Sequence, residues 1–123
     1  MHILIIDDEK TAIETLTRGL RVKGYSVTGV LTAASALALI DTQKDSIAMV
    51  ITDYIMPDMD GMELLDEIRK RHKTLPVILV TAYASKQILV EAMRKKCSGF
   101  LEKPFTLEQL HSEIQRVAAE EGL

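Results

Sequence analysis

Five apolar stretches alternate along the chain with five longer stretches whose apolar residues recur at helical spacing. Four apolar stretches are strong, at 3–6, 47–52, 76–81 and 99–103, and a fainter one that alternates with polar residues lies at 25–30. The strong stretches carry no polar alternation, which is typical of strands covered on both faces of a sheet. The pattern therefore predicts five strands.

The stretches between the strands each carry one apolar stripe, as amphipathic helices do. The stripes consist of Ile13, Leu16 and Leu20; Ala34, Leu37 and Ile40; Met62, Leu65 and Ile68; Ile88, Leu89 and Met93; and Leu107, Leu110, Ile114 and Val117. Three helices also have an N-terminal cap or capping-box pair, namely Asp60 with Glu63, Thr106 with Gln109, and Ser85. Strand and helix alternate five times, which predicts an α/β domain with a parallel sheet and helices on both faces.

Composition places the chain among globular proteins with a substantial core. It has 123 residues, 47% hydrophobic and 27% charged, with a formal net charge of −3. The acidic balance argues against nucleic acid as the domain's own ligand. No apolar run approaches the ~20 residues of a bilayer span. No basic segment precedes the first apolar run, and the single cysteine fits a reducing compartment. We therefore expect a cytoplasmic protein.

We expect residues 1–123 to form a single domain. Its core should run from about 3 to 117, with 118–123 as either a helix end or the start of a linker.

Polar side chains end four of the five predicted strands. Asp7 and Asp8 follow the first strand and Asp53 follows the third. Thr81 ends the fourth strand and Lys103 ends the fifth. The carboxyl ends of parallel strands share one rim, where ligands bind in open α/β sheets. We therefore expect all five side chains on that rim.

The combination suits phosphoryl chemistry on a carboxylate. Three carboxylates in a small space repel one another and call for a counter-cation, and all-oxygen ligands favour Mg²⁺. A lysine and a threonine can neutralise and bind phosphoryl oxygens. Asp53 is the best candidate nucleophile, because it stands alone at its strand end and faces the loop "YIMPDMDG". Asp7 and Asp8 form a natural metal-binding pair.

Each of these residues also has an ordinary explanation. Paired aspartates before a helix are common N-caps, and an aspartate at a strand end is commonly a turn residue. A terminal threonine and a Lys-Pro pair are equally common. Compatible chemistry at four of five strand ends favours the functional explanation over these coincidences.

Four longer motifs occur in a fixed order: "LIIDDE" (4–9), "VITDYIMPDMDGMELL" (50–65), "PVILVTAYAS" (76–85) and "GFLEKPF" (99–105). With this ordered set the chain resembles the receiver domain of two-component response regulators, over about residues 3–117. The resemblance implies a flavodoxin-like (βα)5 fold, a doubly wound parallel sheet with strand order 2-1-3-4-5.

The resemblance also implies the site. Asp53 would be the phospho-acceptor, taking a phosphoryl group from a histidine on a sensor kinase or phosphotransfer protein. Asp8 would hold Mg²⁺, or Mn²⁺ in its place, directly, and Asp7 through water. Asp53 itself and the backbone carbonyl of Ile55 would be further ligands.

Three more residues would complete a switch. Lys103, before a cis bond to Pro104, would contact the acceptor carboxylate and then the phosphoryl group. Thr81 would swing toward the phosphoryl group and Phe100 would turn inward with it. The face formed by the fourth helix, fifth strand and fifth helix would then bind an effector domain or output protein, or form a homodimer. Neither a membrane nor direct nucleic-acid binding is implied, and the domain would not be an enzyme beyond its own phosphorylation and dephosphorylation.

Some residues depart from the family pattern. Lys96 and Cys97 stand where small residues such as glycine and alanine are usual, and we interpret Cys97 as a small buried hydrophobic residue. Ile55 and Tyr83 follow Asp53 and Thr81 by two positions and would flank the path of hydrolytic water. We expect these bulky side chains to slow loss of the phosphoryl group.

Two other functions compete with the switch. A phosphatase or phosphotransferase using an aspartyl-phosphate would want an acid/base aspartate two residues after Asp53, where Ile55 stands. A docking module that works without phosphate would not need the acidic triad, Thr81 and Lys103.

Overall fold

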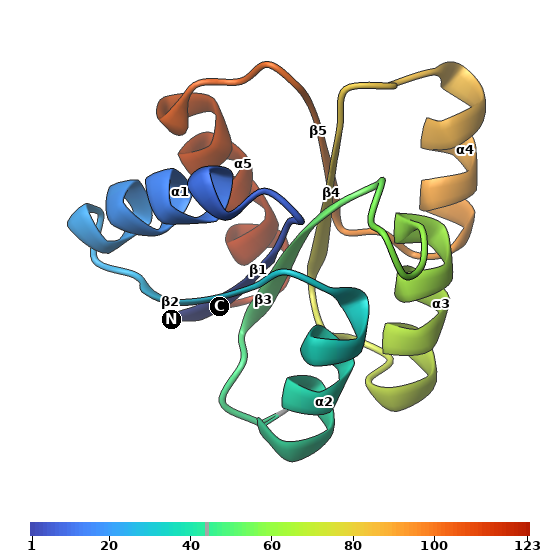
Figure 1. Ribbon diagram of the computed structural model, residues 1–123, viewed down its shortest axis with the longest axis horizontal. Coiled ribbons are helices and arrows are strands. Elements are labelled where there is room, and N and C mark those ends of the chain that lie inside the picture. Colours follow the sequence, from blue (N-terminus) through green and yellow to red (C-terminus); the bar gives the residue numbers. More distant parts are fainter. Residues whose placement is uncertain (44) are drawn as a thin grey trace.

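The computed structural model describes residues 1–43 and 45–123, and within them five strands alternate with five helices (Figure 1). The strands are β1 (His2–Ile6), β2 (Ser26–Val30), β3 (Met49–Asp53), β4 (Val77–Thr81) and β5 (Gly99–Glu102). The helices are α1 (Lys10–Val22), α2 (Ala33–Gln43), α3 (Gly61–Arg71), α4 (Lys86–Arg94) and α5 (Leu107–Glu120). The alternation predicted from the hydrophobic pattern is confirmed.

All strand pairs are parallel, and the strand order is β2-β1-β3-β4-β5. This confirms the flavodoxin-like doubly wound sheet. The order reverses at β1, which pairs with β2 on one side and β3 on the other. The carboxyl ends of β1 and β3 therefore lie next to each other at the point where such sheets bind ligands.

Helices cover both faces of the sheet, so each face has its own apolar core (Figure 1). Along β1, Ile3 and Ile5 pack in the cluster that includes α1 and α5. Leu4 and Ile6 point to the opposite face and pack in the cluster that includes α2 and α3. Burial on both faces explains why the strands are continuous apolar runs.

The predicted helix caps form. Asp60 and Thr106 each accept from the backbone N–H three residues later, and both complete a reciprocal capping box. Ser85 Oγ accepts from the N–H of Ile88 at 3.1 Å. These bonds satisfy N–H groups that have no partner within the helix, and so fix where α3, α4 and α5 begin.

Helix α4 is attached to the domain by little buried surface. In the part of the chain that the structure describes, Ala92 is its only buried residue, whereas α3 buries five. Leu89 and Val90 are each 38% exposed and Met93 is 67% exposed. Much of the apolar surface of α4 therefore faces outward.

The third strand begins later than the predicted range of 47–52. The N–H of Ile47 donates to the carbonyl of Gln43 at 3.2 Å, and the strand begins at Met49. At its other end β3 includes Asp53, which pairs with Val80 of β4. The backbone that carries the Asp53 carboxylate is thus anchored in the sheet.

Candidate functional site

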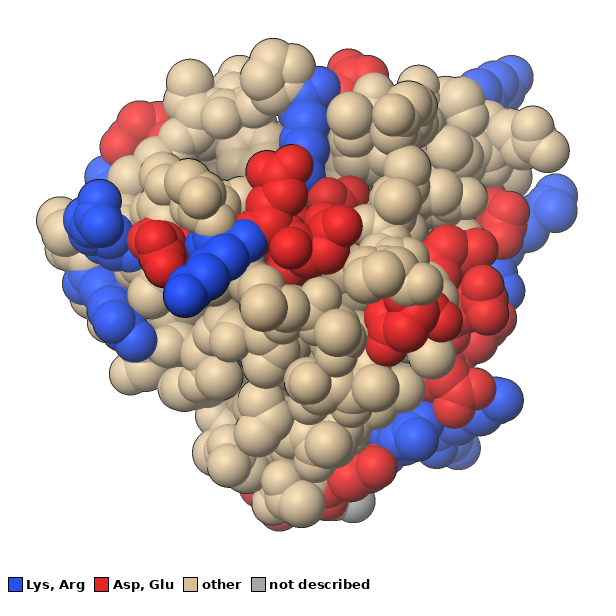
Figure 2. Space-filling model, in the orientation of Figure 1, with Lys and Arg blue, Asp and Glu red and all other residues tan. Residues whose placement is uncertain are grey.

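Asp7, Asp8 and Asp53 meet where β1 and β3 end. One carboxylate oxygen from each lies within 4.8 Å of the others; Asp7 is buried, Asp53 half-buried and Asp8 exposed. On the face of the molecule that Figure 2 shows, acidic side chains gather in the middle, with basic side chains beside them. Three oxygen donors at this spacing suit a hard divalent cation, which would offset their mutual repulsion. The cluster can therefore bind a metal ion.

Backbone N–H groups orient two of these carboxylates. The N–H of Glu9 donates to Asp7 Oδ1 at 2.9 Å, and the N–H of Ile55 donates to Asp53 Oδ1 at 3.3 Å. In each carboxylate the second oxygen, Oδ2, is the one that contacts Lys103. The loops after β1 and β3 thus fix the orientation of these two carboxylates.

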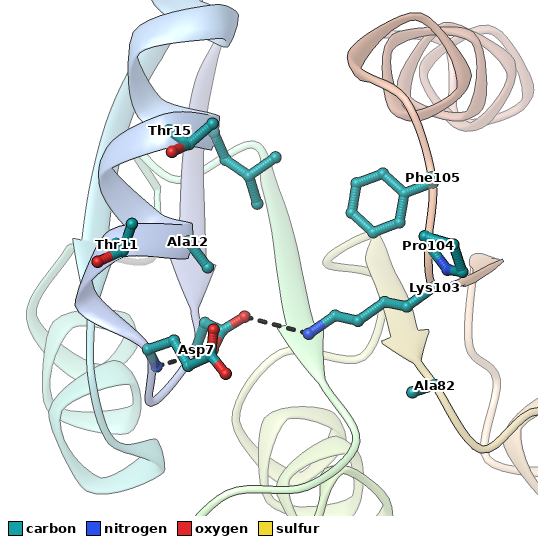
Figure 3. Close-up of a pocket in the computed structure, with 10 residues that line it drawn as sticks. Asp7, Thr11, Ala12, Thr15, Ala82, Lys103, Pro104 and Phe105 are labelled. Atoms are coloured by element: carbon teal, nitrogen blue, oxygen red, sulfur yellow. Dashed lines mark hydrogen bonds and ion pairs between the residues drawn. The ribbon is translucent and has the colours of Figure 1, made fainter.

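Lys103 lies against the cluster. Its Nζ is 2.7 Å from Asp53 Oδ2 and 3.4 Å from Asp7 Oδ2, and Figure 3 shows the contact with Asp7. The N–H of Lys103 donates to the carbonyl of Thr81 at 2.8 Å, and the bond to Pro104 is cis. Burial alone would lower the pKa of Lys103, but the hydrogen bond and charge of Asp53, with the charge of Asp7, outweigh it and raise the pKa. The lysine is therefore positively charged at neutral pH.

The Thr81 hydroxyl does not join the carboxylates through any hydrogen bond among the described residues. Thr81 is fully buried, and its Oγ1 accepts from the N–H of Tyr83 at 2.9 Å. Phe100 is half-buried and packs on the cluster of Met62, Leu79 and Ala92, beneath α4. The structure therefore brings the three acids and Lys103 together and holds Thr81 and Phe100 in separate contacts.

Ile55 and Tyr83 bond to the site residues Asp53 and Thr81 through their backbone N–H groups, and their own side chains are exposed. Ile55 is 49% exposed and Tyr83 is 64% exposed. Neither side chain belongs to an apolar core cluster, and the shielding expected of them stays a prediction.

Cys97 is only partly buried, and its Sγ is 2.8 Å from the carbonyl oxygen of Gly99. Burial raises the pKa of this thiol. The interpretation of Cys97 as a small buried hydrophobic residue is therefore only partly right, because the side chain is partly exposed and its Sγ contacts a carbonyl oxygen.

The structure adds one residue that the sequence pattern did not single out. Asp58, in the loop after β3, accepts from the N–H groups of Ala33 and Ala34 at 3.1 and 2.9 Å. These bonds, led by the one from Ala34, lower the pKa of Asp58. The loop that follows Asp53 is thus tied to the N-terminus of α2. The sequence could show only that the loop contains an acidic residue, because Ala33, whose N–H Asp58 binds, lies 25 residues away in sequence.

A cavity of about 540 Å³ opens beside Lys103, between α1 and the loop from β5 to α5 (Figure 3). Its lining includes Thr15, Leu16, Pro104 and Phe105, together with Asp7. An apolar recess therefore adjoins the charged cluster. The sequence pattern did not predict it, because it arises from the packing of two segments far apart along the chain.

The family model for the response regulator receiver domain matches residues 3–115. The chain belongs to this family. Receiver domains are signalling domains of two-component systems rather than enzymes in the usual sense, which agrees with the expectation from the motifs.

Relatives of known sequence are much longer than this chain. Response regulator protein FleR of Pseudomonas aeruginosa is 36% identical over 116 residues, which cover 94% of this chain and 24% of FleR. Sensor kinase CckA of Brucella abortus is 31% identical over 115 residues, which cover 94% of this chain and 12% of CckA. The chain thus spans a quarter or less of the length of these two proteins.

Solved receiver domains share the fold over nearly the whole chain. A response regulator receiver domain protein from Clostridium thermocellum has a TM-score of 0.92 and 30% identity, covering 98% of this chain and 96% of that one. The beryllofluoride-activated NtrC4 receiver domain dimer has a TM-score of 0.90 and 29% identity, covering 98% of both chains.

No helix among the described residues is both long enough and apolar enough to span a membrane.

Proposed function

We propose that this domain is a phosphorylation-activated switch whose phospho-acceptor is Asp53. The observation that carries the proposal is the cluster of three carboxylates within 4.8 Å, with the Lys103 ammonium 2.7 Å from Asp53 Oδ2. In the reaction, an Asp53 oxygen forms a bond to phosphorus as the N–P bond of a phosphohistidine breaks. The electron pair of that bond returns to the imidazole nitrogen of the donor protein.

The neighbouring residues would bind and orient the reacting groups. Asp7, Asp8, Asp53 and the backbone carbonyl of Ile55 would hold Mg²⁺, or Mn²⁺ in its place. When bound, the ion supplies charge stabilisation for the carboxylate and the phosphoryl oxygens. Lys103 would leave its contact with the free carboxylate and bind a phosphoryl oxygen.

Phosphorylation would be transmitted through Thr81 and Phe100. The Thr81 hydroxyl would give up its hydrogen bond from Tyr83 and donate to a phosphoryl oxygen. Phe100 would then turn inward and alter the face formed by α4, β5 and α5. Only a few kcal/mol of differential contact are needed to shift such a two-state equilibrium.

The partners would be a sensor histidine kinase or phosphotransfer protein and an effector domain or output protein, all in the cytoplasm. Residues 1–123 would act as a single receiver domain with its core at about 3–117. A homodimer through the α4-β5-α5 face would bury the exposed Leu89, Val90 and Met93. The NtrC4 receiver domain is described as a dimer, which supports dimer formation as such.

The direct test uses acetyl phosphate, because its small size removes any need for the cognate kinase. We expect a mass gain of one phosphoryl group in the presence of Mg²⁺, mapped to Asp53, with acetate as the leaving group. Asp53→Asn should abolish the gain and EDTA should suppress it. Glu9→Gln is the matched control, because this neighbouring carboxylate lies outside the cluster.

Other outcomes would select a different function. A mass gain that persists in Asp53→Asn moves the acceptor elsewhere. Turnover of an external phosphoester would indicate an enzyme, and partner binding unchanged by Asp53→Ala would indicate a docking module.

A further inference from the structure

Strand β5 lies at an edge of the sheet, and helix α5 covers part of its free side. The N–H of Phe100 donates to Glu113 Oε2 at 3.0 Å, and Arg116 Nη2 donates to the carbonyl of Ser98 at 3.2 Å. An uncovered edge would leave such backbone groups open to pairing with another strand. Two side chains of α5 thus occupy positions where a neighbouring strand would bind.

Glu113 and Arg116 form a stiff pair. Arg116 Nε is 2.8 Å from Glu113 Oε1, and Arg116 Nη2 is 2.9 Å from Oε2, which is a bidentate arrangement. The Glu113 side chain is only 16% exposed. A planar two-point contact restricts both side chains more than a single ion pair would. The Arg116 contact therefore restricts the Glu113 carboxylate independently of its bond from the N–H of Phe100.

Gly99 makes room for this carboxylate. A Cβ at position 99 would lie 2.9 Å from Glu113 Oε2 and 3.0 Å from both Ile78 and Val117. Any larger residue would push the carboxylate away from the strand. The absence of a side chain at Gly99 thus lets the Glu113 carboxylate reach the N–H of Phe100.

The neighbouring N–H groups of this segment are held from the opposite side. Ser98 and Lys103 both donate to carbonyls of the β4 segment, those of Val77 and Thr81, at 2.8 Å. Phe100 lies between them, and its N–H instead depends on α5. This N–H belongs to the residue whose side chain packs beneath α4.

We propose that Glu113, braced by Arg116, is a positioning residue that fixes the backbone of β5 at Phe100. With the backbone fixed, a change at Phe100 becomes a rotation of its side chain toward or away from α4, rather than a displacement of the strand. The role in switching rests on the function proposed above. The hydrogen bond from the N–H of Phe100 to Glu113 does not depend on that function, and it can be tested in the unphosphorylated protein.

The first experiment measures amide hydrogen exchange by NMR in Glu113→Ala and Glu113→Gln. We expect Glu113→Ala to speed exchange at Phe100 by about tenfold or more relative to Ser98 and Lys103, because the N–H loses a charge-assisted bond. Glu113→Gln keeps an acceptor oxygen and should restore most of the protection. Glu120→Ala is the matched control, because Glu120 also pairs with Arg116, at 2.9 Å, but is not bonded to β5.

Unchanged exchange at Phe100, or an equal rise at all three amides, would overturn the positioning role. If Glu113→Ala does not fold, Arg116→Leu tests the same tie, since Glu113 then loses its support. The exchange rate of the Phe100 amide should again rise more than the rates of the Ser98 and Lys103 amides, and an equal rise at all three would count against the proposal.

The second experiment adds beryllofluoride and Mg²⁺ and follows the amide resonances of α4. We expect a smaller response in Glu113→Ala than in the unmodified protein. If the unmodified protein itself does not respond, the proposed function fails while the exchange result stands. If both respond equally although Phe100 exchanges faster in the variant, the positioning role fails while the proposed function stands.

Discussion

Replacing Asp8 by asparagine should stabilise the metal-free protein. Asp8 is the exposed member of the cluster, and its carboxylate oxygen lies within 4.8 Å of oxygens from Asp7 and Asp53. Asparagine has nearly the same shape and removes one negative charge. Among the described residues no ion pair joins Asp8 to Lys103, so the substitution removes repulsion without removing a known attraction.

The size of the effect follows from that spacing. Two unit charges 4.8 Å apart in a water-like dielectric repel by about 0.9 kcal/mol. A Debye length of about 8 Å at physiological ionic strength reduces this by about half. Two such pairs then give a gain of about 1 kcal/mol in the free energy of unfolding.

Urea unfolding followed by circular dichroism, in EDTA and in saturating Mg²⁺, measures this effect. In EDTA the variant should be more stable than the unmodified protein. Mg²⁺ at about 100 times its Kd should stabilise the unmodified protein by about 2.7 kcal/mol and the variant by less, because the variant has lost a ligand. The difference in stability should therefore shrink or change sign.

The control is Glu9→Gln, which removes a neighbouring charge outside the cluster. If Asp8→Asn were no more stable than the unmodified protein in EDTA, or if Glu9→Gln gained as much, the repulsion assigned to the cluster would be wrong.

Three further predictions concern other parts of the domain. Replacing Ile55 by asparagine together with Tyr83 by alanine should speed loss of the phosphoryl group, because both side chains are exposed beside the site; an unchanged rate of decay after removal of acetyl phosphate would refute the shielding idea. Gly99→Ala should destabilise the fold by about 1–3 kcal/mol in urea unfolding, because its Cβ would overlap the Glu113 carboxylate; a neutral effect would contradict that contact. The hydrogen bonds from Arg116 and then from the N–H of Phe100 lower the pKa of Glu113 against the opposing effect of burial. A lowered pKa in the folded state adds stability at pH values above the usual pKa of glutamate. That added stability is lost as the pH falls through the lowered pKa. The stability advantage of the unmodified protein over Glu113→Gln should therefore shrink on acidification, and a constant difference would argue against it.

The sequence was most informative where structure depends on local order. The continuous apolar runs predicted the parallel sheet, because strands buried on both faces have no polar positions. The rule that parallel strands end on one rim then placed Asp7, Asp53 and Lys103 together, although they are up to 96 residues apart. The capping boxes followed from three-residue spacings, which the helix geometry alone decides.

Contacts between distant segments were beyond the reach of such patterns. The Thr81 hydroxyl could face either the carboxylates or the loop, and only the packed structure shows its bond from Tyr83. The approach of Glu113 to Phe100 depends on the distance between α5 and β5 and on the missing side chain at Gly99. Neither periodicity nor capping spacing contains that information.

The slight burial of α4 has a consequence for how such a domain diversifies. Its outward residues, Leu89, Val90 and Met93, can be exchanged without opening a void in the interior. The acids at the ends of β1 and β3 lie on or directly after strands that are almost fully buried. Variation on the outer face of α4 can therefore change which surfaces the domain recognises without disturbing the acidic cluster.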